Sequence, residues 1–561
     1  MKIQYGPVMR VPDGCPGTPV EPAPSLAERI LWDYAVLKNK DAVSFVLDLG
    51  LMAPVQEGSR LVFGEALPAT GDMVAAACGN IQMLPLRGNV EIDAACFSDV
   101  MTRADLAKAL YEKLHAGLPG LPTIRYQEPI RVQNGTETVE DTYLFFAGGN
   151  AVEYAGTSSF VLRNSTICGT TTRASMPLSG PPAGLTVGGS IRTTLALKQA
   201  QGYFINSRVI SKDWAVFSTD GAEPVNADGE KELSLYIYGS EGVAENAGYG
   251  IYSDLFCNAY FYGTDLQAAE LGAISGTYGA LTFDTIAAGE KDPMLCEKLT
   301  ETDRALQPEK DRGCHLTGGR NAFMIHCVSL PPYWERPGYS QKELPLHEAL
   351  VTVRHSVLKT DLRMDRHIPY PEQVPQYLKH VAGSVILIKS CNARILLDDT
   401  TVLPDPQGTG AILHTAINSD LPFMVRVPDG ITYPGIHVTI RNSDLSGRML
   451  HEDYQRDLYL TLEHSALTGA VCTGTVENWN AFCKADRCEN YIIDPHGYGT
   501  VHGTHLTLGA GSTWNVTGES NLQTLTLAEG AKLNCGSLIV DGASVPAAPG
   551  TYRGRIILKP I

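Results

Sequence analysis

A short pattern of apolar and polar positions recurs along the chain from about residue 155 onward. An apolar residue is followed by Asn, His or Asp, then by Ser or Thr, one variable residue, and Leu, Ile or Val. The pattern occupies residues 164–167, 206–209, 355–358, 399–402, 442–445 and 464–467. Its hydroxyl residues lie 42 residues apart from Ser165 to Ser207, 44 from Ser356 to Thr400, 43 from Thr400 to Ser443, and 22 from Ser443 to Ser465.

These spacings are one or two multiples of about 22 residues, the length of one solenoid coil made of three short strands and three turns. They predict a mostly β protein, a right-handed parallel β-helix, because strand crossovers in parallel sheets are right-handed. Stacked coils place Ile and Leu inside and let Asn side chains form ladders along the axis. A set of separate β-sandwiches is the alternative, although sandwiches do not repeat one motif every 22 residues.

The N-terminal part has a different pattern, and we interpret residues 1–150 as a mixed α/β module that caps the β-helix of residues 151–561. Leucines at 106, 110 and 114 predict a helix over 103–116, with Thr102 as its N-cap and Asp105 three residues on. Residues 26–38 resemble a short helix, whereas 43–51 and 60–63 resemble strands. Insertions are predicted near 285–315, where 297–311 is helix-prone, and near 331–345 and 363–376.

Composition and charge narrow the possible partners. The chain has 55 Gly and 34 Pro, and its net charge is −17. Such a charge disfavours nucleic acid and anionic membranes as partners. No apolar stretch reaches transmembrane length, and no signal peptide follows Met1. Thirteen cysteines include no Cys-x-x-Cys pair. We therefore expect a cytoplasmic protein if Met1 is the native start, and otherwise a secreted or cell-surface protein.

The C-terminal coils resemble a known superfamily. Residues 512–518 (STWNVTG) and 522–527 (LQTLTL) look like the coils of pectin-lyase-like right-handed β-helix proteins, and the chain is most similar to uncharacterised β-helix proteins of anaerobic gut-type bacteria. The resemblance implies the β-helix fold. Because that superfamily includes polysaccharide lyases, glycoside hydrolases and adhesins, it also implies a carbohydrate partner.

One cluster of titratable residues is a candidate site. Aligning the coils places the segment 447–451 beside 410–414, so both histidines would share one face, each followed six residues later by an aspartate. Neighbouring strands lie about 4.8 Å apart, close enough for general acid–base chemistry. The candidate catalytic residues are His414, His451, Asp420 and Asp457, and the candidate binding residues are Glu452, Asp453, Arg456 and Arg448.

The same residues are also consistent with a polar ladder that only stabilises the solenoid. No dense metal-ligand motif is present, and neither a metal nor a cofactor is expected. Asp398 and Asp399 lie in the repeat itself, which favours a structural role over the paired carboxylates of a glycosidase. The sequence thus favours a non-catalytic, adhesin-like protein that binds carbohydrate or presents an interaction surface. A polysaccharide lyase or glycoside hydrolase is the alternative.

Overall fold

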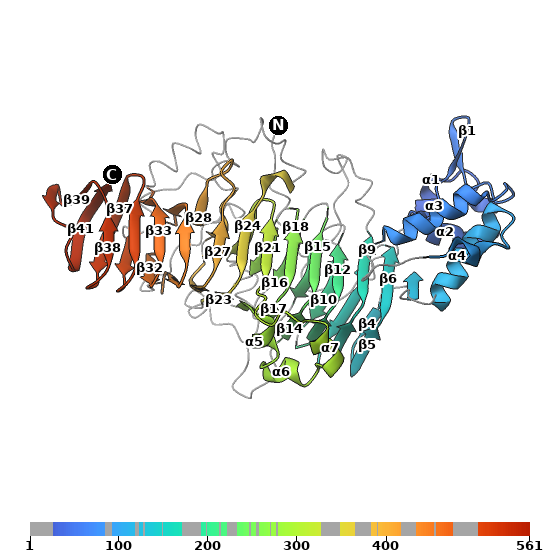
Figure 1. Cartoon of the computed structure of the whole chain (residues 1–561), viewed down its shortest axis with the longest axis horizontal. Coiled ribbons are helices and arrows are strands. Elements are labelled where there is room, and N and C mark those ends of the chain that lie inside the picture. Colours follow the sequence, from blue (N-terminus) through green and yellow to red (C-terminus); the bar gives the residue numbers. More distant parts are fainter. Residues whose placement is uncertain are drawn as a thin grey trace, which may run out of the picture.

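The computed structural model describes residues 26–84, 92–117, 123–126, 130–147, 150–170, 192–197, 199–211, 215–220, 233–245, 248–253, 257–269, 271–275, 279–326, 348–364, 383–389, 391–416, 433–453, 456–474 and 503–561. The chain is mostly β, and its long parallel sheets stack in a solenoid-like way (Figure 1). The predicted insertion at 331–345 lies outside the described residues. The one at 363–376 also does, except for residues 363 and 364.

An 11-stranded parallel sheet contains the first strand of each coil. Its strands are β4 (Ile130–Val132), β7 (Val152–Ala155), β10 (Arg192–Leu197), β13 (Ala215–Asp220), β16 (Tyr249–Ser253), β19 (Leu271–Ser275), β22 (Asn321–His326), β25 (Ile386–Lys389), β28 (Ala411–Ala416), β31 (Arg448–His451) and β34 (Val471–Thr473).

A 15-stranded sheet contains the second strand of each coil and ends in antiparallel strands. Its parallel strands are β5 (Thr136–Glu140), β8 (Ser159–Arg163), β11 (Gln201–Ile205), β14 (Leu233–Tyr238), β17 (Cys257–Tyr262), β20 (Ala280–Asp284), β23 (Ala349–Arg354), β26 (Ala393–Asp398), β29 (Ile436–Arg441), β32 (Leu458–Glu463), β35 (Thr504–Leu508) and β37 (Ser520–Leu527). The antiparallel ones are β39 (Ser537–Val540), β40 (Ala543–Val545) and β41 (Gly550–Lys559).

The third side of the coils is a 9-stranded sheet, followed in later coils by a 4-stranded one. The former contains β3 (Thr123–Tyr126), β6 (Thr142–Ala147), β9 (Thr166–Thr170), β12 (Arg208–Ser211), β15 (Glu241–Ala244), β18 (Asp265–Ala268), β21 (His315–Gly318), β24 (Val357–Thr360) and β27 (Thr401–Leu403). The latter contains β30 (Asp444–Ser446), β33 (Ala466–Gly469), β36 (Thr513–Val516) and β38 (Lys532–Asn534). These sheets begin upstream of residue 151, with β3 to β6.

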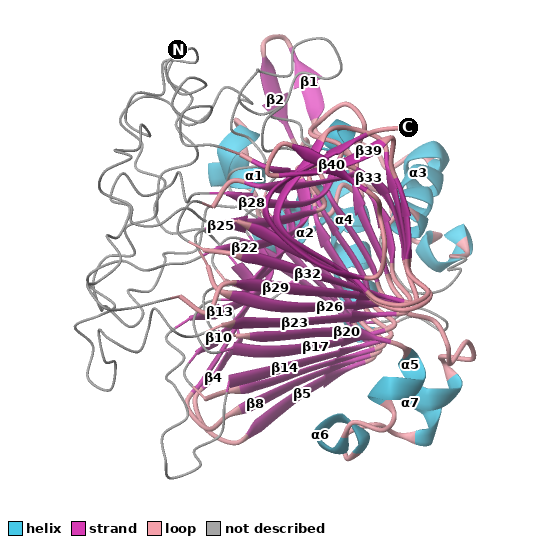
Figure 2. Ribbon diagram, turned by 90° about the vertical axis from the view of Figure 1, so that its left-hand side faces the viewer, coloured by secondary structure: helices cyan, strands magenta, loops and turns pink. Residues whose placement is uncertain are grey.

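One apolar core runs inside the coils from Val132 to Leu558. In most strands, residues that face this core alternate with residues that face away from it. In β29, for example, Ile436, Val438 and Ile440 are buried in the core. Figure 2 shows the strands of successive coils stacked like rungs. Each coil thus contributes a few apolar side chains to a shared core that no coil completes alone.

The repeated motif forms the turn between the 15-stranded sheet and the third side. At all six places the Asn, His or Asp has a positive φ of 45–50°, a left-handed conformation in which these residue types are enriched. The hydroxyl residue that follows links the coils. The backbone N–H groups of Ser165, Ser443 and Ser465 donate to the hydroxyl oxygens of Ser207, Ser465 and Ser512 on the next coil, at 3.2, 3.1 and 3.3 Å. The residues before the hydroxyls link coils as well, since Asn164 donates to Asp141, Asn442 donates to Asp398 at 2.8 Å, and Nδ1 of His355 is 2.7 Å from Asp399. The expected ladder of polar side chains is therefore present, and Ser and Thr contribute to it together with Asn, His and Asp.

The N-terminal part contains the helices α1 (Leu26–Ile30), α2 (Lys40–Asp48), α3 (Gly71–Gln82) and α4 (Arg103–Ala116), the 3-10 turns η1 (Tyr34–Val36) and η2 (Ala94–Phe97), and the hairpin β1 (Val55–Glu57) and β2 (Arg60–Val62). Helix α4 is confirmed, with Thr102 and Asp105 in a capping box. The hairpin confirms the strand predicted near residue 60. The strand predicted over 43–51 is wrong. Its continuous apolar run belongs to the buried helix α2, because periodicity cannot distinguish such a run from a strand.

This module packs on the side of the first coils. Its core includes Tyr143, Phe145, Cys168 and Ile210, which belong to β6, β9 and β12 of the 9-stranded sheet. Tyr143 and Phe145 face away from the solenoid, because the alternating Leu144 and Phe146 belong to the main core. The described part of the module thus covers the outer face of these strands.

The predicted helical insertion lies between β20 and β21. It contains α5 (Ile286–Gly289), α6 (Pro293–Cys296) and α7 (Glu301–Ala305) (Figure 1). Ile286 and Leu295 pack with a group of tyrosines on the outer face of the 15-stranded sheet, and Asp303 pairs with Arg163 of β8. None of the helices in the described ranges combines the length and apolarity needed to cross a bilayer.

Candidate functional site

Six of the longest connections in the sequence begin or end at a strand of the 11-stranded sheet. They are residues 171–191, 221–232, 327–348, 361–385, 417–435 and 474–503, and each joins a strand of this sheet to a strand of another. The turns from the 15-stranded sheet to the third side are short by comparison, apart from the helical insertion. The predicted residues His414, Arg448 and His451 lie in β28 and β31 of this sheet.

His414 lies on the outer face of the 11-stranded sheet. It is fully buried, and its Nε2 is 2.9 Å from Oε2 of Glu452. In the neighbouring strand β25, Leu387 is paired with His414 and belongs to a small apolar cluster separate from the main core. Glu452 keeps 15% of its side chain exposed, so the pair has limited contact with solvent. A buried imidazole–carboxylate pair suits either proton transfer or hydrogen bonding to a ligand hydroxyl.

His451 lies on the opposite side of the sheet, facing the core. Thr415 of β28 is its partner in the ladder, and their side chains are 2.6 Å apart between Oγ1 and Nδ1. Met449, two residues before His451 and therefore on the same face, belongs to the main core. The expectation that His414 and His451 share one face is wrong.

A β-bulge explains this correction. Ala411 is paired with Arg448, as the sequence alignment implied, but the register then shifts and Leu413 is paired with Met449. The extra residue, Ile412, is buried together with Leu413 in the main core. A shift of one residue moves a side chain to the other face of a sheet, so His414 is opposite Leu450 instead of His451.

Other predicted residues share the outer face with His414. Arg448 is the first residue of β31, and Glu452 directly follows the strand, an even number of residues away and therefore on the same face. Arg448 donates to the backbone oxygen of Thr409. Lys389 at the end of β25 also faces outward, since Ile388 before it is in the core, and it is 6% exposed. The sequence analysis missed Lys389, which ends an ordinary apolar strand. The outer face thus holds a carboxylate, an imidazole and two cations.

The remaining predicted residues lie elsewhere. Asp453 and Arg456 form a buried ion pair, 3.2 Å apart, and Arg456 also donates to Asn392 at 3.0 Å. Asp457 accepts the backbone N–H of Gly503 at 2.9 Å and contacts Tyr459 of the 15-stranded sheet. Asp420 lies outside the described residues. The structure therefore does not bring Asp457 together with His414 or His451.

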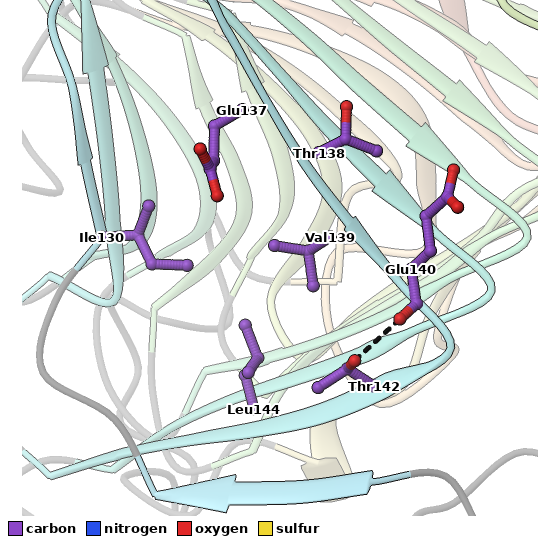
Figure 3. A pocket seen from close by; sticks show the side chains of 7 residues that line it. All are labelled: Ile130, Glu137, Thr138, Val139, Glu140, Thr142 and Leu144. Carbon is purple, nitrogen blue, oxygen red and sulfur yellow. Dashed lines mark hydrogen bonds between the residues drawn. The ribbon is translucent and has the colours of Figure 1, made fainter.

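A cavity of about 250 Å³ lies at the N-terminal end of the solenoid (Figure 3). It is lined by Ile130, Leu144, Thr142 and the strand β5. Glu137 of β5 is paired with the core residue Phe160, so its carboxylate points toward the core side of this end strand. An inward-pointing charge on an edge strand disfavours pairing with another chain. We therefore interpret the cavity as the protected end of the solenoid.

Within the described residues, no group of three or more His, Cys, Asp or Glu side chains is arranged to hold a metal ion. No protein-family model, curated protein or solved structure matches this chain.

Proposed function

We propose that the chain is a right-handed parallel β-helix that binds carbohydrate without cleaving it, in the manner of an adhesin. Its binding face would be the outer face of the 11-stranded sheet. The observation that carries this proposal is the group of polar side chains on that face, where His414 and Glu452 are 2.9 Å apart and Arg448 and Lys389 also face outward. A stack of coils offers an extended surface for a long ligand.

The handedness and the family belong to the same proposal. Parallel strands joined by crossovers nearly always wind to the right, which supports a right-handed coil. The C-terminal run that resembles pectin-lyase-like proteins, and β-helix proteins of anaerobic gut-type bacteria in particular, supports a carbohydrate partner. The net charge of −17 supports a ligand other than nucleic acid.

Binding is favoured over cleavage by the scatter of the predicted catalytic set. His451 faces the core and Asp457 contacts the 15-stranded sheet, so neither adjoins the His414–Glu452 pair. What remains on the outer face is a carboxylate, an imidazole and the cations of Arg448 and Lys389. Such groups hydrogen-bond sugar hydroxyls well.

A polysaccharide lyase or glycoside hydrolase is the second candidate, and the His414–Glu452 pair is the observation that favours it. An imidazole held 2.9 Å from a carboxylate can accept or donate a proton when a substrate oxygen lies within hydrogen-bond distance. Arg448 and Lys389 would then neutralise an acidic sugar.

A screen of the full chain against soluble and immobilised glycans tests the proposal. The same glycans are incubated with the protein and assayed for new reducing ends and for unsaturated products. We expect retention on at least one glycan with neither product. Retention on none would contradict carbohydrate binding, whereas release of products would replace our proposal with the second candidate.

A further inference from the structure

A second surface carries a repeated pattern of its own. Three consecutive strands of the 15-stranded sheet read IHVTIR in β29, LYLTLE in β32 and THLTL in β35. Each contains an aromatic residue, then an apolar residue, then a threonine: His437 and Thr439, Tyr459 and Thr461, His505 and Thr507. The intervening Val438, Leu460 and Leu506 are in the core, so all six side chains face outward.

The six side chains form two straight rows, which we call the outer grid. His437 is paired with Tyr459 and Tyr459 with His505, while Thr439 is paired with Thr461 and Thr461 with Thr507. The three rings stack with centroids 4.6 and 4.7 Å apart and interplanar angles of 9° and 15°. Every member is partly exposed. Because neighbouring strands lie about 4.8 Å apart, the grid presents polar groups at that interval along the solenoid axis.

Among the residues that the structure describes, the three threonine hydroxyls have no hydrogen-bond partner, and the threonines are partly exposed, so these hydroxyls can bond to a ligand. The rings stand edge-outward, because their faces cover one another. The polar atoms of the rings face the protein. Nε2 of His437 is 3.0 Å from the backbone oxygen of Pro434, the phenol of Tyr459 donates to Asp457 at 3.4 Å, and the buried Nε2 of His505 is 3.7 Å from Asp457. The threonine row is therefore the part of the grid that offers polar groups to a ligand.

The surroundings of the grid are weakly acidic. In the next row, Arg441 is 2.8 Å from Glu463 and 3.9 Å from Asp398, so one arginine faces two carboxylates. On the other side, Asp457 adds a carboxylate beside Tyr459. An uncharged, regularly spaced set of hydrogen-bonding groups matches a neutral polymer of hydroxylated units better than a polyanion.

We propose that the outer grid is a second binding site, which takes an extended neutral polysaccharide lying along the solenoid axis. This inference deepens the proposed carbohydrate-binding function and rests on it, but it concerns a different sheet. Hydroxyls at intervals of about one strand spacing meet the hydroxyls of successive sugar units. The three threonines of the row can each make a weak hydrogen bond to the same polymer, so their contributions to the binding free energy add.

The test uses the full chain and three neutral polysaccharides, namely cellulose, xylan and mannan, with polygalacturonate as the anionic comparison. The double variant Thr461→Val and Thr507→Val removes two hydroxyls and keeps side-chain shape and strand propensity. Thr317→Val is the matched control. It faces outward in β21 of the 9-stranded sheet, between Gln267 and Lys359, and therefore lies on a different side from the grid. Thermal midpoints verify that all variants fold.

We expect the wild-type chain and the control to bind a neutral polysaccharide equally, and the double variant to bind it about tenfold more weakly, as the loss of two hydrogen bonds implies. Unchanged binding by the double variant would overturn the inference. If Glu452→Gln weakens that binding and the double variant does not, the proposed function stands and the outer grid is rejected as a binding site. Binding to polygalacturonate only would also overturn the inference, and binding to no glycan would overturn both proposals.

Discussion

Thr415 and His451 touch across neighbouring strands on the core side of the 11-stranded sheet, with 2.6 Å between Oγ1 and Nδ1. Both residues are at most 2% exposed. This contact gives His451 a part in stability and keeps it away from the proposed binding face. His414, only one residue from Thr415, lies on that face and contacts Glu452.

We predict that His451→Ala destabilises the protein by about 2–4 kcal/mol, because it leaves a cavity in the core and removes one of the two hydrogen-bond partners of the Thr415 hydroxyl. Chemical denaturation checks this value. Glycan binding by the folded variant should equal that of the wild type. An unchanged free energy of unfolding, or a selective loss of binding, would contradict the inward orientation.

The hydroxyl ladder makes a separate prediction. Ser443 accepts the N–H of Thr400 at 2.9 Å and donates to the backbone oxygen of Arg441 at 2.7 Å. Ser443→Ala leaves that N–H unsatisfied in a buried turn and should cost about 1–3 kcal/mol in the free energy of unfolding. Ser446→Ala, at an exposed position of β30, is the control and should change stability by less than about 0.5 kcal/mol. Equal effects would show that the ladder does not link the coils.

The turn motif is the part of the fold that the sequence predicts best. A repeat of Asn, His or Asp before Ser or Thr combines a residue that tolerates positive φ with a hydroxyl that bonds the next coil, and both needs recur once per coil. Helix α4 was equally predictable, since its leucines and capping box are local features.

The candidate site was harder to predict, because it depends on register. Nothing in residues 410–414 distinguishes a regular strand from one in which Ile412 adds a bulge, yet that residue decides the face of His414. The outer grid, in contrast, is readable as an aromatic-x-Thr triplet in three coils. The triplet is inconspicuous in the sequence, because its aromatic position is histidine in two strands and tyrosine in the third.

The tyrosines under the helical insertion predict a limit of stability at alkaline pH. Burial, followed by Asp292 and Glu297, raises the pKa of Tyr203 to about 12, and burial also raises the pKa values of Tyr236 and Tyr262. A raised pKa favours the protonated form in the folded state. The stabilisation is therefore complete below about pH 10 and is lost as the pH rises toward 12.

Ultraviolet absorbance of tyrosinate and circular dichroism, followed together from pH 9 to about 12, check this prediction. We expect a group of tyrosines to ionise only as structure is lost, and Tyr203→Phe to reduce that group by one. Ionisation of every tyrosine near pH 10 with intact circular dichroism would contradict burial under the insertion.

The central claim is that the outer face of the 11-stranded sheet binds carbohydrate, and the affinity of Glu452→Gln for the best glycan of the screen tests it most directly. The control is Glu463→Gln on the 15-stranded sheet, whose carboxylate pairs with Arg441. We predict at least about tenfold weaker binding for Glu452→Gln, since a charged hydrogen bond is lost, and wild-type affinity for the control. Equal affinity of both variants and the wild type would contradict the claim.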